Sequence, residues 1–198
     1  MTEIDPVVKP KGLLAKLGSD LMLGFLVAFL SVLTALAAYQ GSIADSQESD
    51  LNVAGQKQLT EANSFYLETN QFVLYDYNMY DGWYVTEDPD IADYFYANFS
   101  EELTASIDRS EGPFDDEYYD SMYADADSLY DEALDYFDQA QAAGERAIQM
   151  QLVVLIFAVG LALAAYASLI KPEKRIRAVF AIASTLAFIM GLISYMIA

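Results

Sequence analysis

Cysteine and histidine are both absent from the sequence, and their absence excludes several kinds of chemistry. Without cysteine the chain has no disulfide, no thiol nucleophile and no thiolate ligand for a metal. Without histidine it lacks the commonest general base and metal ligand of proteins. The sequence also holds no glycine-rich phosphate loop, and no pair of carboxylates stands out among its 30 acids. We therefore expect neither an enzyme nor a cofactor-binding protein.

Basic residues are scarce, with ten Lys and Arg against 30 Asp and Glu and a formal net charge of −20. Nevertheless, 55% of the residues are hydrophobic, so charge and hydrophobicity must lie in different parts of the chain. Residues 40–150 contain 26 acids and only Lys57, Arg109 and Arg146 as bases. Such a region repels phosphate, which argues against nucleic acid as a partner.

Three long apolar runs without charge occupy residues 21–39, 152–170 and 178–198. At roughly 1.5 Å per residue, each run matches a hydrocarbon core about 30 Å thick, so we expect three transmembrane helices instead of buried core helices. The predicted segments are a cytoplasmic N-terminus at 1–20, spans at 21–39, 151–170 and 178–198, an acidic tyrosine-rich domain at 40–150 and a basic loop at 171–177.

The remaining bases predict the orientation of these spans, because cytoplasmic loops are enriched in Lys and Arg. They lie before the first span and between the second and third: Lys9, Lys11, Lys16, Lys171, Lys174, Arg175 and Arg177. We expect a cell-membrane protein with a cytoplasmic N-terminus and with residues 40–150 and the C-terminus outside. One alternative stays open, because Ala35-Leu36-Ala37 resembles a signal-peptidase site.

Small residues recur at four-residue spacing in two of the spans, where they let helices approach closely in lipid. These residues are Gly160, Ala164 and Ser168 in the second span and Ala183, Ala187 and Gly191 in the third. We expect the second span to pack on the third, with contacts between copies of the chain as the alternative. The spans hold no charged residue, and Asp20 lies only at an edge, which disfavours an ion relay.

Local signals divide residues 40–150 into helices and make the predicted fold all-α. Asp81-Gly82 is typical of a helix end, Asp88-Pro89 of a helix start and Gly112-Pro113 of a further end. Acids at 115–117 favour the first turn of the next helix. We predict helices over about 42–81, 88–110 and 114–150, the first continuing from the first span and the last running into the second.

Periodic small and apolar residues predict that the first and last of these helices pair in antiparallel fashion, as in a coiled coil. The last helix carries the clearer stripe: Tyr119, Met122, Ala126, Leu129, Ala133, Tyr136, Ala140, Ala143 and Ala147. The first carries a weaker one: Leu51, Gly55, Ala62, Phe65, Thr69 and Phe72. The result would be a helical stalk or bundle between the first and second spans.

Aromatic residues concentrate between the predicted stalk helices and suggest a small head. The candidates for a partner-binding surface are Tyr80, Trp83, Tyr84, Tyr94 and Tyr96. Tyrosine and tryptophan are favoured at binding surfaces because they are rigid and amphipathic. The alternative is that a small head needs these rings to build its core.

Clustered acids are weak candidates for a Ca²⁺ site, which takes several oxygen ligands. They are Asp115, Asp116, Glu117, Asp120, Asp125 and Asp127, but their spacing does not fit an EF-hand loop. Diffuse attraction of cations is expected at this charge density, and an acidic, lysine-poor surface also resembles adaptation to high salt. Asn98-Phe99-Ser100 matches a glycosylation sequon.

Taken together, these patterns favour a non-enzymatic membrane protein whose acidic outer domain contacts another protein or another copy of itself. The second hypothesis is an accessory subunit of a channel or transporter, or a cation-responsive sensor, that forms an oligomer around its spans. The oligomeric state would separate the two hypotheses.

Overall fold

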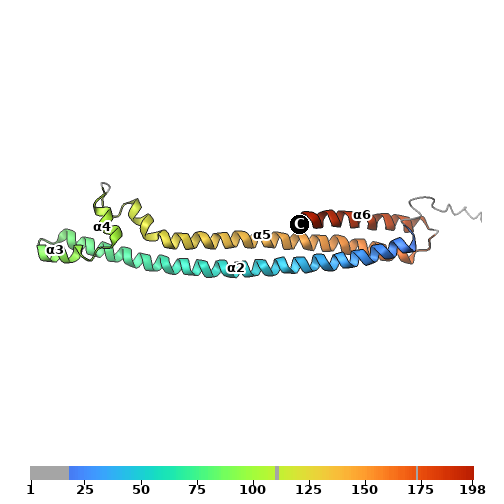
Figure 1. Ribbon diagram of the computed structural model, residues 1–198, viewed down its shortest axis with the longest axis horizontal. Helices are drawn as coiled ribbons and strands as arrows, with labels where there is room; N and C mark the ends of the chain where they lie inside the picture. Colours follow the sequence, from blue (N-terminus) through green and yellow to red (C-terminus); the bar gives the residue numbers. More distant parts are fainter. Residues whose placement is uncertain (1–17, 110–111, 173) are drawn as a thin grey trace, which may run out of the picture. The chain divides into compact units, whose positions relative to one another are not determined.

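Helices make up nearly all of the computed structural model, which describes residues 18–109, 112–172 and 174–198 and contains no strand in these ranges. The helices are α2 (Asp20–Val85), α3 (Pro89–Tyr96), α4 (Glu101–Ile107), α5 (Asp116–Leu169) and α6 (Arg175–Ile197), as Figure 1 shows. The prediction of an all-α fold is confirmed. The predicted cytoplasmic lysines Lys9, Lys11 and Lys16 lie outside the described residues.

Helices α2, α5 and α6 are each long and apolar enough to cross a membrane. Helix α2 has 66 residues and α5 has 54, so each extends well beyond the apolar run that it contains. This confirms that the first predicted outer helix continues from the first apolar run and that the last continues into the second. Helix α6, with 23 residues, is the third apolar run with one extra turn at its start.

The chain divides into two compact units. We call residues 50–139 the acidic unit, and the described residues of 18–49 and 140–198 the span unit. Helices α2 and α5 contribute to both units, whereas α3 and α4 belong to the acidic unit and α6 to the span unit.

In the span unit, α6 packs on α5 through small residues, as predicted (Figure 1). Ser184 donates a hydrogen bond of 2.8 Å to the carbonyl oxygen of Gly160. A Cβ atom added at Gly160 would lie 3.1 Å from the Cβ of Ala187, and one added at Gly191 would lie 2.4 Å from the Phe157 ring. The two glycines therefore allow a closer approach of the helices than any larger residue would.

The other predicted packing residues have more varied surroundings. Ala164 is fully buried in the span-unit core together with Leu30 and Phe157. Ala183 is half-buried, and the Ser168 hydroxyl donates to carbonyl oxygens of its own helix. Of the six predicted packing residues, Gly160, Ala164 and Gly191 are therefore buried, and Ala187 is half-buried against Gly160.

Arg177 is buried at the start of α6, with only 3% of its surface exposed. Its guanidinium donates 2.8 Å to the Gly18 carbonyl and 2.9 Å to the Ile170 carbonyl, and it pairs with the Asp20 carboxylate. One side chain thus connects the start of α2, the end of α5 and the first turn of α6. The sequence had suggested only a basic loop residue here.

In the acidic unit, α2 and α5 run antiparallel, as predicted. Gly55 lies against Phe137, Gln58 donates a 2.7 Å hydrogen bond to Glu132, and Asn70 accepts one of 2.7 Å from Tyr123. Residues later in α2 therefore contact residues earlier in α5, which is the order of an antiparallel pair. The predicted stripe on α5 is confirmed, because every member is buried or half-buried, with alanines 126, 133, 140 and 147 almost fully buried.

The predicted stripe on α2 is only partly correct. Gly55, Ala62 and Thr69 are buried, but Phe65 and Phe72 are exposed. The buried face continues instead through Val73 and Asp76. Small residues spaced seven apart form the face of α2 that meets α5, where Gly55 lies against the Phe137 ring, and Phe65 and Phe72 lie outside this contact.

Two of the predicted helix boundaries are wrong. Helix α2 does not end at Asp81-Gly82 but continues to Val85, because Gly82 serves close packing: an added Cβ would lie 2.4 Å from the Phe95 ring. The predicted helix over 88–110 is divided into α3 and α4, and position 110 lies outside the described residues. Its start is confirmed, since the Asp88 side chain caps α3 and Pro89 is its first residue.

The turn before α5 has two residues with left-handed backbone conformation, Gly112 at φ 94° and Phe114 at φ 62°. Glycine adopts this conformation freely, but phenylalanine is strained there. The Phe114 ring stacks on Tyr77 with centroids 4.2 Å apart and meets Tyr118 edge to face at 5.1 Å. Burial among these rings offsets the strain and fixes the entry of the chain into α5.

Candidate functional site

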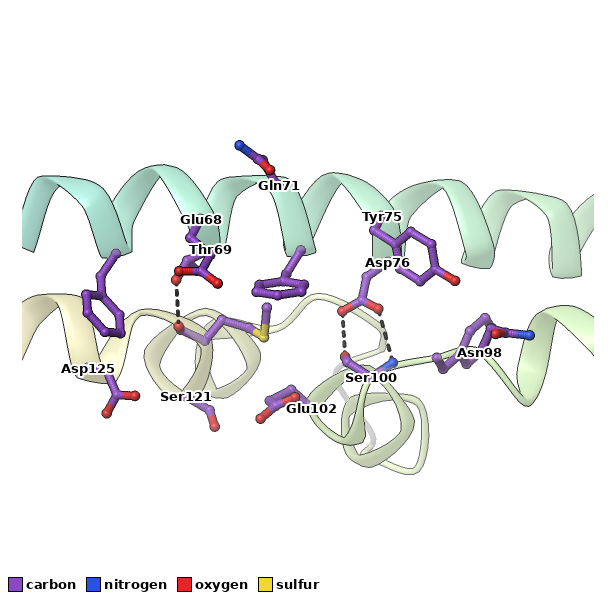
Figure 2. Close-up of a pocket in the computed structure, with 14 residues that line it drawn as sticks. Glu68, Thr69, Gln71, Tyr75, Asp76, Asn98, Ser100, Glu102, Ser121 and Asp125 are labelled. Atoms are coloured by element: carbon purple, nitrogen blue, oxygen red, sulfur yellow. Dashed lines mark hydrogen bonds between the residues drawn. The ribbon is translucent and has the colours of Figure 1, made fainter.

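A pocket of about 850 Å³ lies in the acidic unit, between α2, the segment that leads into α4, and the first turns of α5 (Figure 2). Its lining is Phe65, Glu68, Thr69, Gln71, Phe72, Tyr75, Asp76, Asn98, Phe99, Ser100, Glu102, Ser121, Met122 and Asp125. This set contains four acids, four aromatic rings and no basic residue. Pockets of this size hold a small ligand or a few side chains of a partner.

Asp76 organises one end of the pocket, and its side chain is 1% exposed. Its carboxylate accepts hydrogen bonds from the Ser100 backbone N–H at 3.1 Å, from the Ser100 hydroxyl and from the Tyr118 hydroxyl at 2.9 Å. Figure 2 shows Asp76 pointing from α2 toward Ser100. A buried carboxylate is stable only when it is hydrogen-bonded in this way.

Ser100 serves two elements at once. Its hydroxyl donates to Asp76 and accepts a 3.0 Å hydrogen bond from the Leu103 N–H, which caps the start of α4. This short chain of hydrogen bonds joins α4 to α2 at one wall of the pocket, beside the core cluster that Leu103 shares with Val73. Tyr118, on α5, joins the third element to the same carboxylate.

The remaining three acids of the pocket come from three different helices. Glu68 lies on α2, Glu102 on α4 and Asp125 on α5. Figure 2 shows Glu102 and Asp125 opposite α2. None of the three has a hydrogen-bond or ion-pair partner among the described residues. Their negative charges are therefore available to a ligand, whereas the charge of Asp76 is already satisfied.

Aromatic and thioether groups form the apolar part of the lining. Phe72 is 55% exposed, and Phe65 and Tyr75 are also exposed. Phe99 and Met122 are half-buried and belong to the neighbouring core cluster around Val73. The first three rings are thus accessible from solvent, whereas Phe99 and Met122 pack against the core.

The weak metal candidates divide into two groups in the structure. Asp115 accepts two hydrogen bonds from the Arg109 guanidinium, at 2.5 and 2.7 Å, and one of 2.9 Å from the Tyr118 N–H, while Glu117 lies 3.6 Å from Arg109. The hydrogen bond from Arg109 lowers the pKa of Asp115 below its usual value. These two acids therefore form ion pairs with Arg109 at the start of α5.

The other metal candidates, Asp116, Asp120, Asp125 and Asp127, are exposed on α5. Within the described ranges, no three acids come together in a way that would hold a metal ion. Only Asp125 among the six candidates lines the pocket.

The five predicted partner-surface rings fall into two classes. Tyr80 and Trp83 are half-buried; Trp83 lies 6.0 Å from Phe99 between ring centroids, and both support the head. Tyr84 is 73% and Tyr94 is 63% exposed, and Tyr96 is exposed as well. Tyr80 and Trp83 thus fit the core interpretation, whereas the exposed Tyr84, Tyr94 and Tyr96 stay candidates for a partner surface.

Three tyrosines at the start of α5 hold their protons more strongly than usual. Burial and the hydrogen bond to Asp76 raise the pKa of Tyr118. The hydrogen bond with Tyr77 raises the pKa of Tyr119 from 10.0 to about 12, and desolvation raises the pKa of Tyr123. These hydroxyls stay neutral near pH 7 and act as hydrogen-bonding groups of the fold.

The sequon residue Asn98 lines the pocket and donates a 2.7 Å hydrogen bond from its side-chain amide to the Tyr94 carbonyl. Its partner in the sequon, Ser100, uses its hydroxyl for Asp76. In the folded acidic unit both side chains are thus engaged.

Comparison of the sequence with protein-family models, with curated proteins and with solved structures finds no match.

Sequence reasoning missed the role of Asp76 and placed Phe65 and Phe72 on the wrong face of α2. A signal was present, because Gly55, Ala62, Thr69 and Asp76 follow each other at intervals of seven residues. Such an interval keeps residues on one face of a paired helix. An acid on a face of small residues indicates a buried, hydrogen-bonded carboxylate.

Proposed function

We propose that this chain is a non-enzymatic protein of the cell membrane and that its acidic unit contacts a partner protein outside the cell. The three apolar helices support membrane anchoring. Lys171 and Lys174 lie exposed between α5 and α6, and the exposed Arg175 begins α6, which favours a cytoplasmic position for this loop. With three spans, the acidic unit and the C-terminus then lie outside.

The observation that carries the proposed contact is the exposure of large side chains on the acidic unit. Tyr84 and Tyr94 expose most of their surface, and the open pocket adds Phe72 and Tyr75. Exposed clusters of large apolar groups mark interaction sites on soluble surfaces. Tyrosine and phenylalanine also bury much area at a low cost in conformational entropy when a partner binds.

The experiment is site-specific crosslinking in intact membranes. A photo-reactive residue is placed at Tyr94, and the matched control is placed at Lys57, an exposed position on the same unit. We expect one reproducible protein adduct from Tyr94 and none from Lys57. Equal adducts at both positions, or none at either, would contradict the proposal. An adduct of twice the mass of the chain would indicate self-assembly as the form that the contact takes.

A further inference from the structure

The acidic pocket combines features that select one ligand chemistry. We propose that it receives a lysine or arginine side chain from a basic segment of the partner protein; this inference rests on the proposed function. The positive head group would pair with one of the acids Glu68, Glu102 and Asp125, and the aliphatic stem would lie on Phe72 and Met122, all of which line the pocket.

Charge is the first reason for a cationic ligand. The lining has four acids and no base, and three of these acids lack a partner among the described residues. An anion would be repelled, and a neutral ligand would leave the carboxylates uncompensated. Hydrogen bonds between ionised partners are stronger than those between neutral groups, which favours an ammonium or guanidinium group.

The rings are the second reason, and they argue for an organic cation. An ammonium or guanidinium group is attracted to the face of an aromatic ring. Lysine and arginine also bury their methylene stems on apolar surface while the charged end stays among polar groups. A bare Ca²⁺ or Mg²⁺ ion would use neither the rings nor the thioether, because it binds through oxygen ligands.

Charge complementarity also favours a segment of another protein over a second acidic unit. Residues 50–139 contain 23 acids and two bases, so two such units repel each other. A basic segment of another protein carries the opposite charge and is attracted to the acidic unit.

The test uses the full chain in detergent and a short labelled peptide with lysines separated by glycine and leucine, blocked at both ends. Fluorescence anisotropy at about 0.15 M salt limits the contribution of distant charges. We expect saturable binding with a Kd below about 1 mM. A peptide with norleucine in place of every lysine should bind at least about tenfold more weakly.

Two matched sets of variants locate the binding. The pocket triple is Glu68→Gln, Glu102→Gln and Asp125→Asn, and it should weaken binding about tenfold. The control triple removes the same charge from the same three helices outside the pocket: Glu61→Gln, Glu101→Gln and Asp131→Asn. It should change binding by less than about threefold.

Phe72→Leu keeps the net charge and removes only the aromatic face, so it should weaken binding by a few-fold. This variant, together with Glu102→Gln alone, also carries the test if the pocket triple fails to fold, which the fluorescence of Trp83 reports.

Four results would overturn the inference. They are equal losses in the pocket and control triples, equal binding of the norleucine peptide, no saturation up to about 1 mM, and displacement of the peptide by an equal concentration of tetramethylammonium. The last result would indicate a site for small free cations. If crosslinks from Tyr94 persist in the pocket triple while peptide binding is unaffected, the proposed contact stands and only this inference fails.

Discussion

Replacement of Asp76 should reveal how strongly one buried carboxylate organises the acidic unit. The Asp76→Ala variant leaves the Ser100 N–H, the Ser100 hydroxyl and the Tyr118 hydroxyl without their acceptor. Tyr118 is fully buried, whereas Ser100 is half-buried and can be rehydrated in part. Each unsatisfied buried group costs about 1–3 kcal/mol, so we expect a total loss of about 3–5 kcal/mol.

Asp76→Asn separates the charge from the hydrogen-bonding geometry. Its amide oxygen still accepts from the Ser100 N–H, and its NH₂ group can donate to either hydroxyl once that hydroxyl turns. The expected loss is about 1–2 kcal/mol. Asp81→Ala, at an exposed acid on the same helix, is the control and should change stability by less than about 0.5 kcal/mol.

Urea unfolding of the full chain in detergent, followed by the fluorescence of Trp83, measures these differences. Trp83 is the single tryptophan of the sequence, and it packs within the acidic unit against Phe99 and Tyr96. The signal therefore reports unfolding of that unit without interference from the spans. Equal losses for the alanine and asparagine variants, or a loss below about 1 kcal/mol for alanine, would refute the role given to the carboxylate.

Gly191→Ala should lower the stability of the span unit by about 1–3 kcal/mol, because the added Cβ meets the buried Phe157 ring. Gly24→Ala is the control and should leave the stability unchanged, because nothing lies within 4 Å of a Cβ at that position. Equal thermal unfolding midpoints of the two variants in detergent would contradict this packing. Arg177→Gln should lower the stability by about 1–3 kcal/mol, whereas Arg175→Gln, at an exposed position, should change it little. A larger loss of stability for Arg175→Gln than for Arg177→Gln in the same assay would show that the buried contacts contribute nothing. Between pH 10 and about pH 12 the acidic unit should lose stability as the pH rises, since native Tyr119 keeps a proton that the unfolded chain releases. In urea unfolding measured at several pH values, Tyr119→Phe should reduce this dependence of stability on pH.

Patterns that depend on neighbours in the sequence could be predicted correctly. The apolar runs predicted the three candidate spans, and the spacing of the alanines predicted the buried face of α5, including Ala126 and Ala133. Asp88 and Pro89 gave the start of α3, because a helix cap needs only local residues. In each case the structural cause lies within a few turns of the residue concerned.

Features that depend on distant partners could not be predicted. The pair Asp81-Gly82 resembles a helix end, but the role of Gly82 depends on Phe95, which approaches from α3. Arg177 resembled a loop charge, but its burial depends on carbonyls at Gly18 and Ile170. The pocket is the strongest example, because its three unpaired acids lie on three helices that only the fold brings together.

The most direct test of the central claim is the side of the membrane on which the pocket lies. The chain has no cysteine, so single cysteines can be introduced without background. A membrane-impermeant maleimide should label Ser121→Cys, an exposed pocket residue, in intact cells, and should label Lys171→Cys only after permeabilisation. Labelling of Lys171→Cys in intact cells, with Ser121→Cys protected until permeabilisation, would contradict an outward-facing pocket.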